Sequence, residues 1–222
     1  MIRKFAKLIP KDLLDESGSV FYSGSQAWRA ATPLYVLGVN PGGSPDSQAT
    51  ETVAWHTDKV IRTEPDNWSA SRDESWKGAP PGTWGMQPRV LHMMNSLGLD
   101  PGQIPASNLI FVRSQREDAI KSEFEHLAEK CWPFHQEVIE TLRPKAILCF
   151  GKTAGGYVRA RLGGNRLIRE FVENNNRRWK SQCFDSDRGI VIVVATHPSI
   201  ADWTAPTSDP CSLIAKAIES DA

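Results

Sequence analysis

The sequence predicts an α/β protein with three layers, in which helices cover both faces of a central four-stranded, mostly parallel sheet. Four short runs of apolar residues have the length and composition of strands that are buried on both faces. Segments with helical spacing separate these runs, and such alternation favours a parallel sheet with right-handed crossovers. The chain has 222 residues, 40% of them hydrophobic, which is enough for one large core, so we expect a single domain over residues 1–222.

Charge and composition argue against several classes of protein. The 26 basic and 26 acidic residues cancel, so no global positive field points to nucleic acid or to a membrane as partner, which still leaves room for a local patch. No apolar stretch approaches the ~20 residues of a membrane-spanning helix, and residues 1–6 lack the apolar segment of a signal peptide. We therefore expect a cytoplasmic monomer without a membrane partner.

The cysteines give no sign of a metal site or of a disulfide framework. No two of them lie close together in the sequence; they are Cys131, Cys149, Cys183 and Cys211. Cys149 falls within an apolar run and is expected in the core. The sequence therefore predicts neither a metal nor another cofactor.

The first half of the chain contains one clear strand and one clear helix. Residues 2–15 have mixed helical spacing interrupted by a proline, which predicts a helix or two short turns. Residues 34–37 are four large apolar residues and form the first strand. Residues 45–82 are polar with little periodicity, which is typical of a functional or mobile segment. A helix is predicted from residue 87 to about residue 97, with a proline in its first turn and a glycine at its end.

The second half alternates between helices and strands more regularly. A second strand is expected around residues 104–112, and residues 121–142 have the spacing of a long amphipathic helix with a kink near Pro133. Residues 146–150 form the third strand, which leads through a tight turn into another helix. A fourth strand at 190–195 and a last helix at about 208–218 complete the pattern.

One basic stretch stands out between the third and fourth predicted strands. Residues 159–180 hold seven arginines and lysines against two glutamates. The stretch is interpreted either as a solvent-exposed helix face or as a surface that contacts phosphates.

Polar residues gather where the predicted strands end. The carboxyl ends of parallel strands share one edge of the sheet, where open α/β sheets bind their ligands. The first strand ends there in Gly38-Val39-Asn40-Pro41-Gly42, in which Pro41 stops the strand and Gly42 allows close approach of a ligand to the main chain. We expect Asn108, the turn at Gly151 and His197 to lie at the same edge.

Two of these motifs together resemble a known superfamily. Gly38-Val39-Asn40-Pro41-Gly42 combined with His197-Pro198-Ser199 is similar to the two-motif signature of the uracil-DNA glycosylase superfamily. Residues 131–154 resemble the helix-to-strand stretch of its iron–sulfur type, and Ser107-Asn108-Leu109-Ile110 occupies the place of its base-reading asparagine. The resemblance covers most of residues 34–200. It implies a uracil-DNA-glycosylase-like fold and a DNA-binding repair enzyme that flips uracil, or a related deaminated base, out of DNA and hydrolyses its N-glycosidic bond.

The chain departs from the iron–sulfur type in ways that change the expected chemistry. Only Cys131 falls on one of the four cysteine positions of that type, so no iron–sulfur cluster is expected. The first motif carries asparagine, as in the mismatch-specific and single-strand-selective types. Asp202 adds a negative charge where DNA would approach.

The resemblance implies two catalytic residues. His197 would donate a hydrogen bond to the base oxygen on which charge develops, and Ser199 would contact a phosphate. Asn40 would hold the attacking water, because an amide is no effective base at neutral pH. From the residues alone, the alternative is a turn asparagine that bonds to nearby backbone.

The remaining site residues would bind the base. Asn108 would pair with O4 and N3–H of uracil, since one amide supplies both an acceptor and a donor, although a strand-end cap is the alternative. Trp84 would provide the stacking face, with Trp55 and His56 as rivals. The main chain of the first motif would complete the pocket; its members are Gly38, Val39, Pro41 and Gly42.

Two other functions stay open. The chain could be a module of the same fold that binds a base or nucleic acid without cleaving it, which zero net charge and Asp202 favour. It could also be a hydrolase of free nucleosides, which needs no positive groove.

Overall fold

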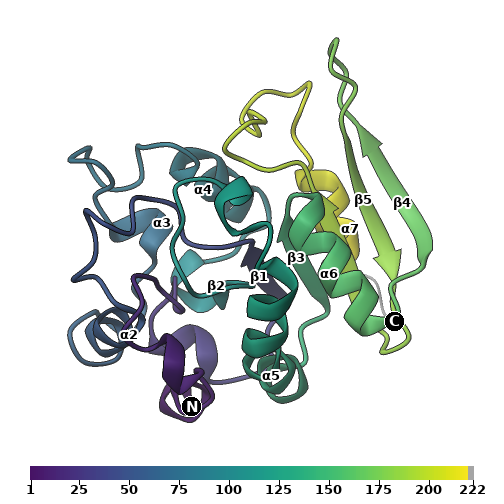
Figure 1. The fold of residues 1–222 in the computed structure, drawn as a ribbon. Helices are drawn as coiled ribbons and strands as arrows, with labels where there is room; N and C mark the ends of the chain where they lie inside the picture. Colours follow the sequence, from purple (N-terminus) through teal and green to yellow (C-terminus); the bar gives the residue numbers. More distant parts are fainter. Residues whose placement is uncertain (220–222) are drawn as a thin grey trace.

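A mixed six-stranded sheet forms the centre of the protein, whose structure, a computed structural model, describes residues 1–219 (Figure 1). The strand order is β2-β1-β3-β6-β5-β4. The strands are β1 Leu34–Gly38, β2 Ala106–Asn108, β3 Ala146–Phe150, β4 Arg166–Val172, β5 Lys180–Asp185 and β6 Val191–Ala195. The α/β class is therefore confirmed, whereas the predicted four-stranded sheet is wrong in its number of strands.

The four predicted strands are present and adjacent. β1 pairs in parallel with both β2 and β3, and β3 pairs in parallel with β6. Every residue of β1, β3 and β6 is buried, as the continuous apolar runs predicted. The second strand is shorter than expected, because only 106–108 of the predicted 104–112 pair with β1.

The two additional strands form an antiparallel hairpin at the edge of the sheet. β5 pairs with β6 and β4 pairs with β5, both antiparallel (Figure 1). This hairpin corrects the interpretation of residues 159–180 as a helix face. Helix α6 (Lys152–Leu162) ends at Gly163, whose φ of 70° lies in the left-handed region, and β4 follows. β4 carries charged, exposed residues because it is an edge strand, so its sequence lacks the apolar run of a buried strand.

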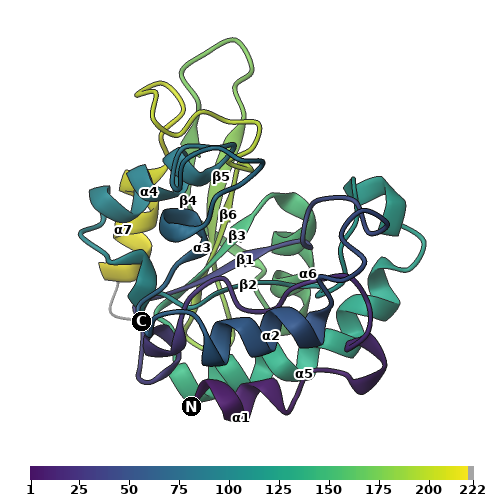
Figure 2. The ribbon, with the colours of Figure 1, turned by 90° about the vertical axis from the view of Figure 1, so that its left-hand side faces the viewer.

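Helices cover both faces of the sheet, because side chains along each buried strand alternate between two cores. Tyr35 and Leu37 belong to the core beneath α1, α2, α5 and α6, whereas Leu34 and Val36 belong to the core beneath α4 and α7 (Figure 2). The remaining helices have the following bounds: α1 Ile2–Ala6, α2 Val53–Arg62, α3 Ala70–Asp73, α4 Gln87–Ser96, α5 Phe124–Leu142 and α7 Cys211–Glu219. Within residues 1–219 no helix has the length and apolar character needed to span a membrane.

The predictions for residues 121–142 and 45–82 need comment. The long helix is confirmed as α5, which runs through Pro133 without a break in the assigned helix. The polar segment 45–82 is not structureless, since it contains α2 and α3. The hydroxyl of Thr52 caps α2 by accepting a hydrogen bond from the Trp55 N–H at 3.1 Å, a local signal that the polar composition obscured.

Candidate active site at the carboxyl edge of the sheet

The ends of β3 and β6 meet beside the His197 ring. The Gly151 N–H donates to the Ala195 carbonyl at 2.9 Å, which joins the two strand ends. Gly151 has a φ of 91°, so the turn into α6 requires glycine or a strained residue. The ring of Phe150 packs edge-on against His197, with centroids 6.0 Å apart. The predicted meeting of the Gly151 turn and His197 is therefore observed.

His197 has a defined tautomer. Its Nδ1 faces the Ser199 backbone N–H at 3.1 Å and the Ser199 hydroxyl at 2.8 Å. A backbone N–H can only donate, so Nδ1 accepts and the ring proton of the neutral form sits on Nε2. Burial lowers the pKa of His197 below 6.5, while the charge of Glu117 acts in the opposite direction. The neutral imidazole thus presents Nε2–H as a hydrogen-bond donor.

The loop that carries His197 is held from both sides. Arg89 of α4 donates from Nη1 to the Pro198 carbonyl at 2.6 Å. Arg177, in the turn between β4 and β5, donates to the Ile200 carbonyl at 2.9 Å. Arg177 is also paired at 3.0 Å with Glu173, whose side chain is fully buried. These three residues were not among the sequence candidates, because their contacts cross between distant elements.

Asn40 uses the donor side of its amide within the protein. Nδ2 lies 3.0 Å from the Pro41 carbonyl, 3.3 Å from the Val112 carbonyl and 2.8 Å from the Ser114 hydroxyl. The two carbonyl acceptors fix the amide orientation, since only the NH₂ group can bond to them. Oδ1 accepts no hydrogen bond from any described residue, so it is the side of the amide that can accept one from a water. Asn40 thus stabilises the turn through Nδ2, and its Oδ1 can hold a water molecule.

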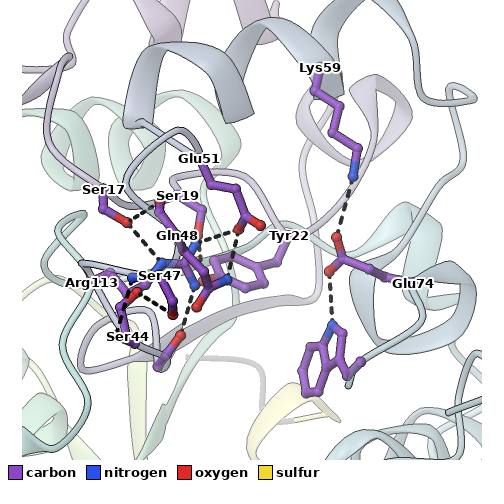
Figure 3. Close-up of polar contacts among 12 residues, drawn as sticks. Ser17, Ser19, Tyr22, Ser44, Ser47, Gln48, Glu51, Lys59, Glu74 and Arg113 are labelled. Atoms are coloured by element: carbon purple, nitrogen blue, oxygen red, sulfur yellow. Dashed lines mark hydrogen bonds and ion pairs between the residues drawn. The ribbon is translucent and has the colours of Figure 1, made fainter. Parts of the chain in front are cut away.

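The turn that follows Asn40 is fixed by a buried arginine. Arg113 donates to the Gly42 carbonyl at 2.8 Å. It also donates to the Ser17 hydroxyl at 3.1 Å and pairs with Glu51 at 3.1 Å (Figure 3). Its side chain is only 9% exposed. A largely buried guanidinium that bonds through each of its three nitrogens holds the main chain of the first motif in place. Arg113 is a further residue that the sequence analysis missed.

Asn108 lies against the first motif, as predicted. Gly38 and Asn108 are paired in the sheet, and a Cβ on Gly38 would lie 2.2 Å from the Asn108 Oδ1. Glycine is therefore required at position 38 to admit the amide. Asn108 is only 9% exposed and lies beside the Tyr22 hydroxyl, whose pKa burial raises to about 12.

A carboxylate occupies the same edge without having been predicted. Glu117 accepts a hydrogen bond from the Thr153 hydroxyl in the first turn of α6, two residues after Gly151. Its effect on the pKa of His197 places it within electrostatic reach of the ring. No local pattern marks Glu117, because its position depends on how the loop before α5 folds over α6.

The two tryptophans proposed for stacking do not join this group, whereas His56 lies against Tyr22, the neighbour of Asn108. Trp84 is 46% exposed in the loop before α4, and within residues 1–219 no hydrogen bond or ring contact connects it to Asn40, Asn108 or His197. Trp55 is 48% exposed on α2, with the Lys59 ammonium 5.7 Å from its ring. His56 is buried against Tyr22, with ring centroids 6.1 Å apart, and burial lowers its pKa to about 3.

Two cavities, of about 370 and 440 Å³, lie away from this edge. One is between α1 and α2, and the other is near Pro33 and Ile104, where β1 and β2 begin. Among residues 1–219 no group of three metal-ligating side chains gathers around His197. A scan against models of known protein families and a search of curated proteins both return no match for this chain.

Proposed function

We propose that this protein is a DNA glycosylase that hydrolyses the N-glycosidic bond of uracil, or of a related deaminated base, in DNA. The observation that carries the proposal is the Nε2–H of a neutral His197, held in place by Ser199 at the edge where the first motif ends. The resemblance of the two motifs supports the same reaction, and the uracil-DNA-glycosylase-like fold is part of the proposal.

Cleavage of the N-glycosidic bond requires a hydrogen-bond donor to the base rather than an acid. As the bond between the base nitrogen and the sugar carbon breaks, the electron pair stays on the base and negative charge spreads to its oxygens. A neutral imidazole that donates from Nε2 stabilises this charge, and the lowered pKa keeps His197 neutral at physiological pH. Water then adds to the sugar carbon and its proton leaves to solvent or to the base.

Asn40 and Glu117 divide the role that one aspartate could fill. Oδ1 of Asn40 accepts a hydrogen bond from the attacking water and orients it, without taking its proton. Glu117 supplies negative charge on the same edge, which stabilises a cation-like sugar. Asn108, pressed against Gly38, reads the base as it enters beside the first motif.

A DNA strand would run along the turn between β4 and β5. The Arg177 guanidinium lies 4.3 Å from the Trp179 ring and bonds to the Ile200 carbonyl, which joins the hairpin to the His197 loop. Ile200 is 59% exposed and Trp179 37%. Exposed apolar side chains around a cation suit stacking with bases beside a phosphate backbone. Asp202 repels DNA less than the sequence suggested, because it lies 3.5 Å from Arg89.

The test is uracil release from three substrates by the full chain: uracil in single-stranded DNA, uracil in duplex DNA, and free deoxyuridine. Release from either DNA but not from deoxyuridine supports the proposal. Binding without release would instead indicate a binding module, and release from deoxyuridine alone would indicate a nucleoside hydrolase.

A further inference from the structure

Three different metal-ligating side chains meet far from the His197 edge. His92 lies on α4, while Asp209 and Cys211 lie at the start of α7, on the face of the sheet that these two helices share (Figure 2). One ligand atom from each residue lies within 4.8 Å of the other two. His92 Nε2 and Asp209 Oδ2 lie 2.9 Å apart.

The geometry suits a small divalent cation after a modest adjustment. Zinc binds imidazole nitrogen, carboxylate oxygen and thiolate sulfur at 2.0–2.3 Å, so tetrahedral ligand atoms are roughly 3.3–3.8 Å apart. A pair at the 4.8 Å limit would need to close by about 1–1.5 Å. The His92–Asp209 pair, now 2.9 Å apart, would need to open by about 0.4 Å to admit the ion. Cys211 is buried at the base of the group, whereas His92 and Asp209 are about one-third exposed, which leaves an entry path and a position for a water ligand.

Helix capping explains only part of this arrangement. Asp209 Oδ1 accepts a hydrogen bond from the Cys211 backbone N–H at 2.9 Å, so the carboxylate caps α7 as well as pairing with His92. Capping does not require a thiol beside that carboxylate. The hydroxyl of Ser96, one turn beyond His92 on α4, lies near the thiol, where it could donate a hydrogen bond to a metal-bound sulfur.

We propose that His92 Nε2, a carboxylate oxygen of Asp209 and the thiolate of Cys211 bind one Zn²⁺ ion, with water as the fourth ligand. Binding releases the thiol proton to solvent and replaces the direct bond between His92 and Asp209. The ion fastens α4 to α7. Arg89, one turn before His92, holds the Pro198 carbonyl, so the ion also steadies the loop that carries His197. The proposal does not depend on the reaction that His197 performs.

The test uses the full chain, freed of metal by a chelator and titrated with Zn²⁺ or Co²⁺ at pH 7.5. We expect one equivalent of Zn²⁺ to bind and to raise the unfolding temperature. Co²⁺ should give a thiolate-to-cobalt charge-transfer band. His92→Ala should weaken Zn²⁺ binding at least tenfold, and Cys211→Ser should abolish the band. His126→Ala, an exposed histidine on α5, and Cys183→Ser, another buried cysteine, are the matched controls and should bind as the parent does.

Absence of Zn²⁺ binding by the parent would overturn the proposal, as would binding that survives in both variants. If Cys211→Ser does not fold, His92→Ala and Asp209→Asn still decide the question, because both positions are partly exposed. Loss of the Zn²⁺ effect in His126→Ala alone would place the ion on α5 instead.

Discussion

Replacing Asn40 by Asp should destabilise the protein at neutral pH. Asn and Asp have nearly the same shape, so the change replaces only the NH₂ group. That group donates toward the carbonyls of Pro41 and Val112 and toward the Ser114 hydroxyl. A carboxylate oxygen in the same place would face two carbonyl oxygens with no hydrogen to share.

The magnitude follows from the bonds that are lost. An NH₂ group has two hydrogens, and each intramolecular hydrogen bond contributes about 0.5–1.5 kcal/mol net, so the free energy of unfolding should fall by about 1–3 kcal/mol. Ser114 cannot fully compensate, because its hydroxyl already donates to the Arg116 carbonyl at 2.9 Å. Ser114→Ala is the matched control, since it removes one acceptor and leaves both carbonyl partners of Asn40. Its cost should stay below about 1.5 kcal/mol.

The dependence on pH gives the decisive readout. The two carbonyls disfavour the charged form, so the pKa of the introduced Asp should lie above its unfolded value of about 3.9. A group whose folded pKa is raised loses its stabilising contribution as pH rises through that pKa. The loss in free energy of unfolding relative to the parent, measured by denaturant unfolding, should therefore be largest at pH 7 and shrink toward pH 4. A variant as stable as the parent at pH 7, or a deficit that grows on acidification, would refute the role given to the Asn40 amide.

Three further outcomes follow from the same geometry. Gly38→Ala should displace the Asn108 amide and lower the free energy of unfolding by about 1–3 kcal/mol. It should also narrow the preference for uracil over cytosine, whereas an unchanged free energy of unfolding would contradict the close contact. Glu173→Gln should lower the free energy of unfolding by about 1–3 kcal/mol, which is less than for a fully buried ion pair because Arg177 is partly exposed. An unaltered melting temperature would count against a stabilising Arg177–Glu173 pair. The rate of uracil release should be maintained as pH falls through 6.5, because burial lowers the pKa of His197 and the ring stays neutral. A pH–rate profile whose midpoint lies above 6.5 would rule out neutral His197 as the hydrogen-bond donor.

The sequence predicted the strands that are buried along their whole length. Residues 34–37, 146–150 and 190–195 are apolar throughout because they are buried on both faces, so their position, pairing and shared edge could be inferred. The meeting of Gly38 with Asn108, and of Gly151 with His197, followed from that shared edge. The functional roles of these residues stay predictions.

The remaining features depend on contacts that no local pattern encodes. The sequence of β4 is charged, because β4 is an edge strand and buries little apolar surface. Arg113 and Glu117 reach the site from the loops that follow β2, and nothing in their immediate sequence marks them. Two backbone carbonyls set the direction of the Asn40 amide and one backbone N–H sets the tautomer of His197, so only the folded structure reveals them.

The central claim is that Nε2–H of His197 stabilises the departing base. Single-turnover release of uracil from DNA tests it directly, with His197→Ala compared with the parent at saturating enzyme. Loss of one such donor should slow release by about 10²–10³-fold, while DNA affinity changes little. No release by the parent from either single-stranded or duplex DNA, or equal rates in parent and variant, would contradict the account.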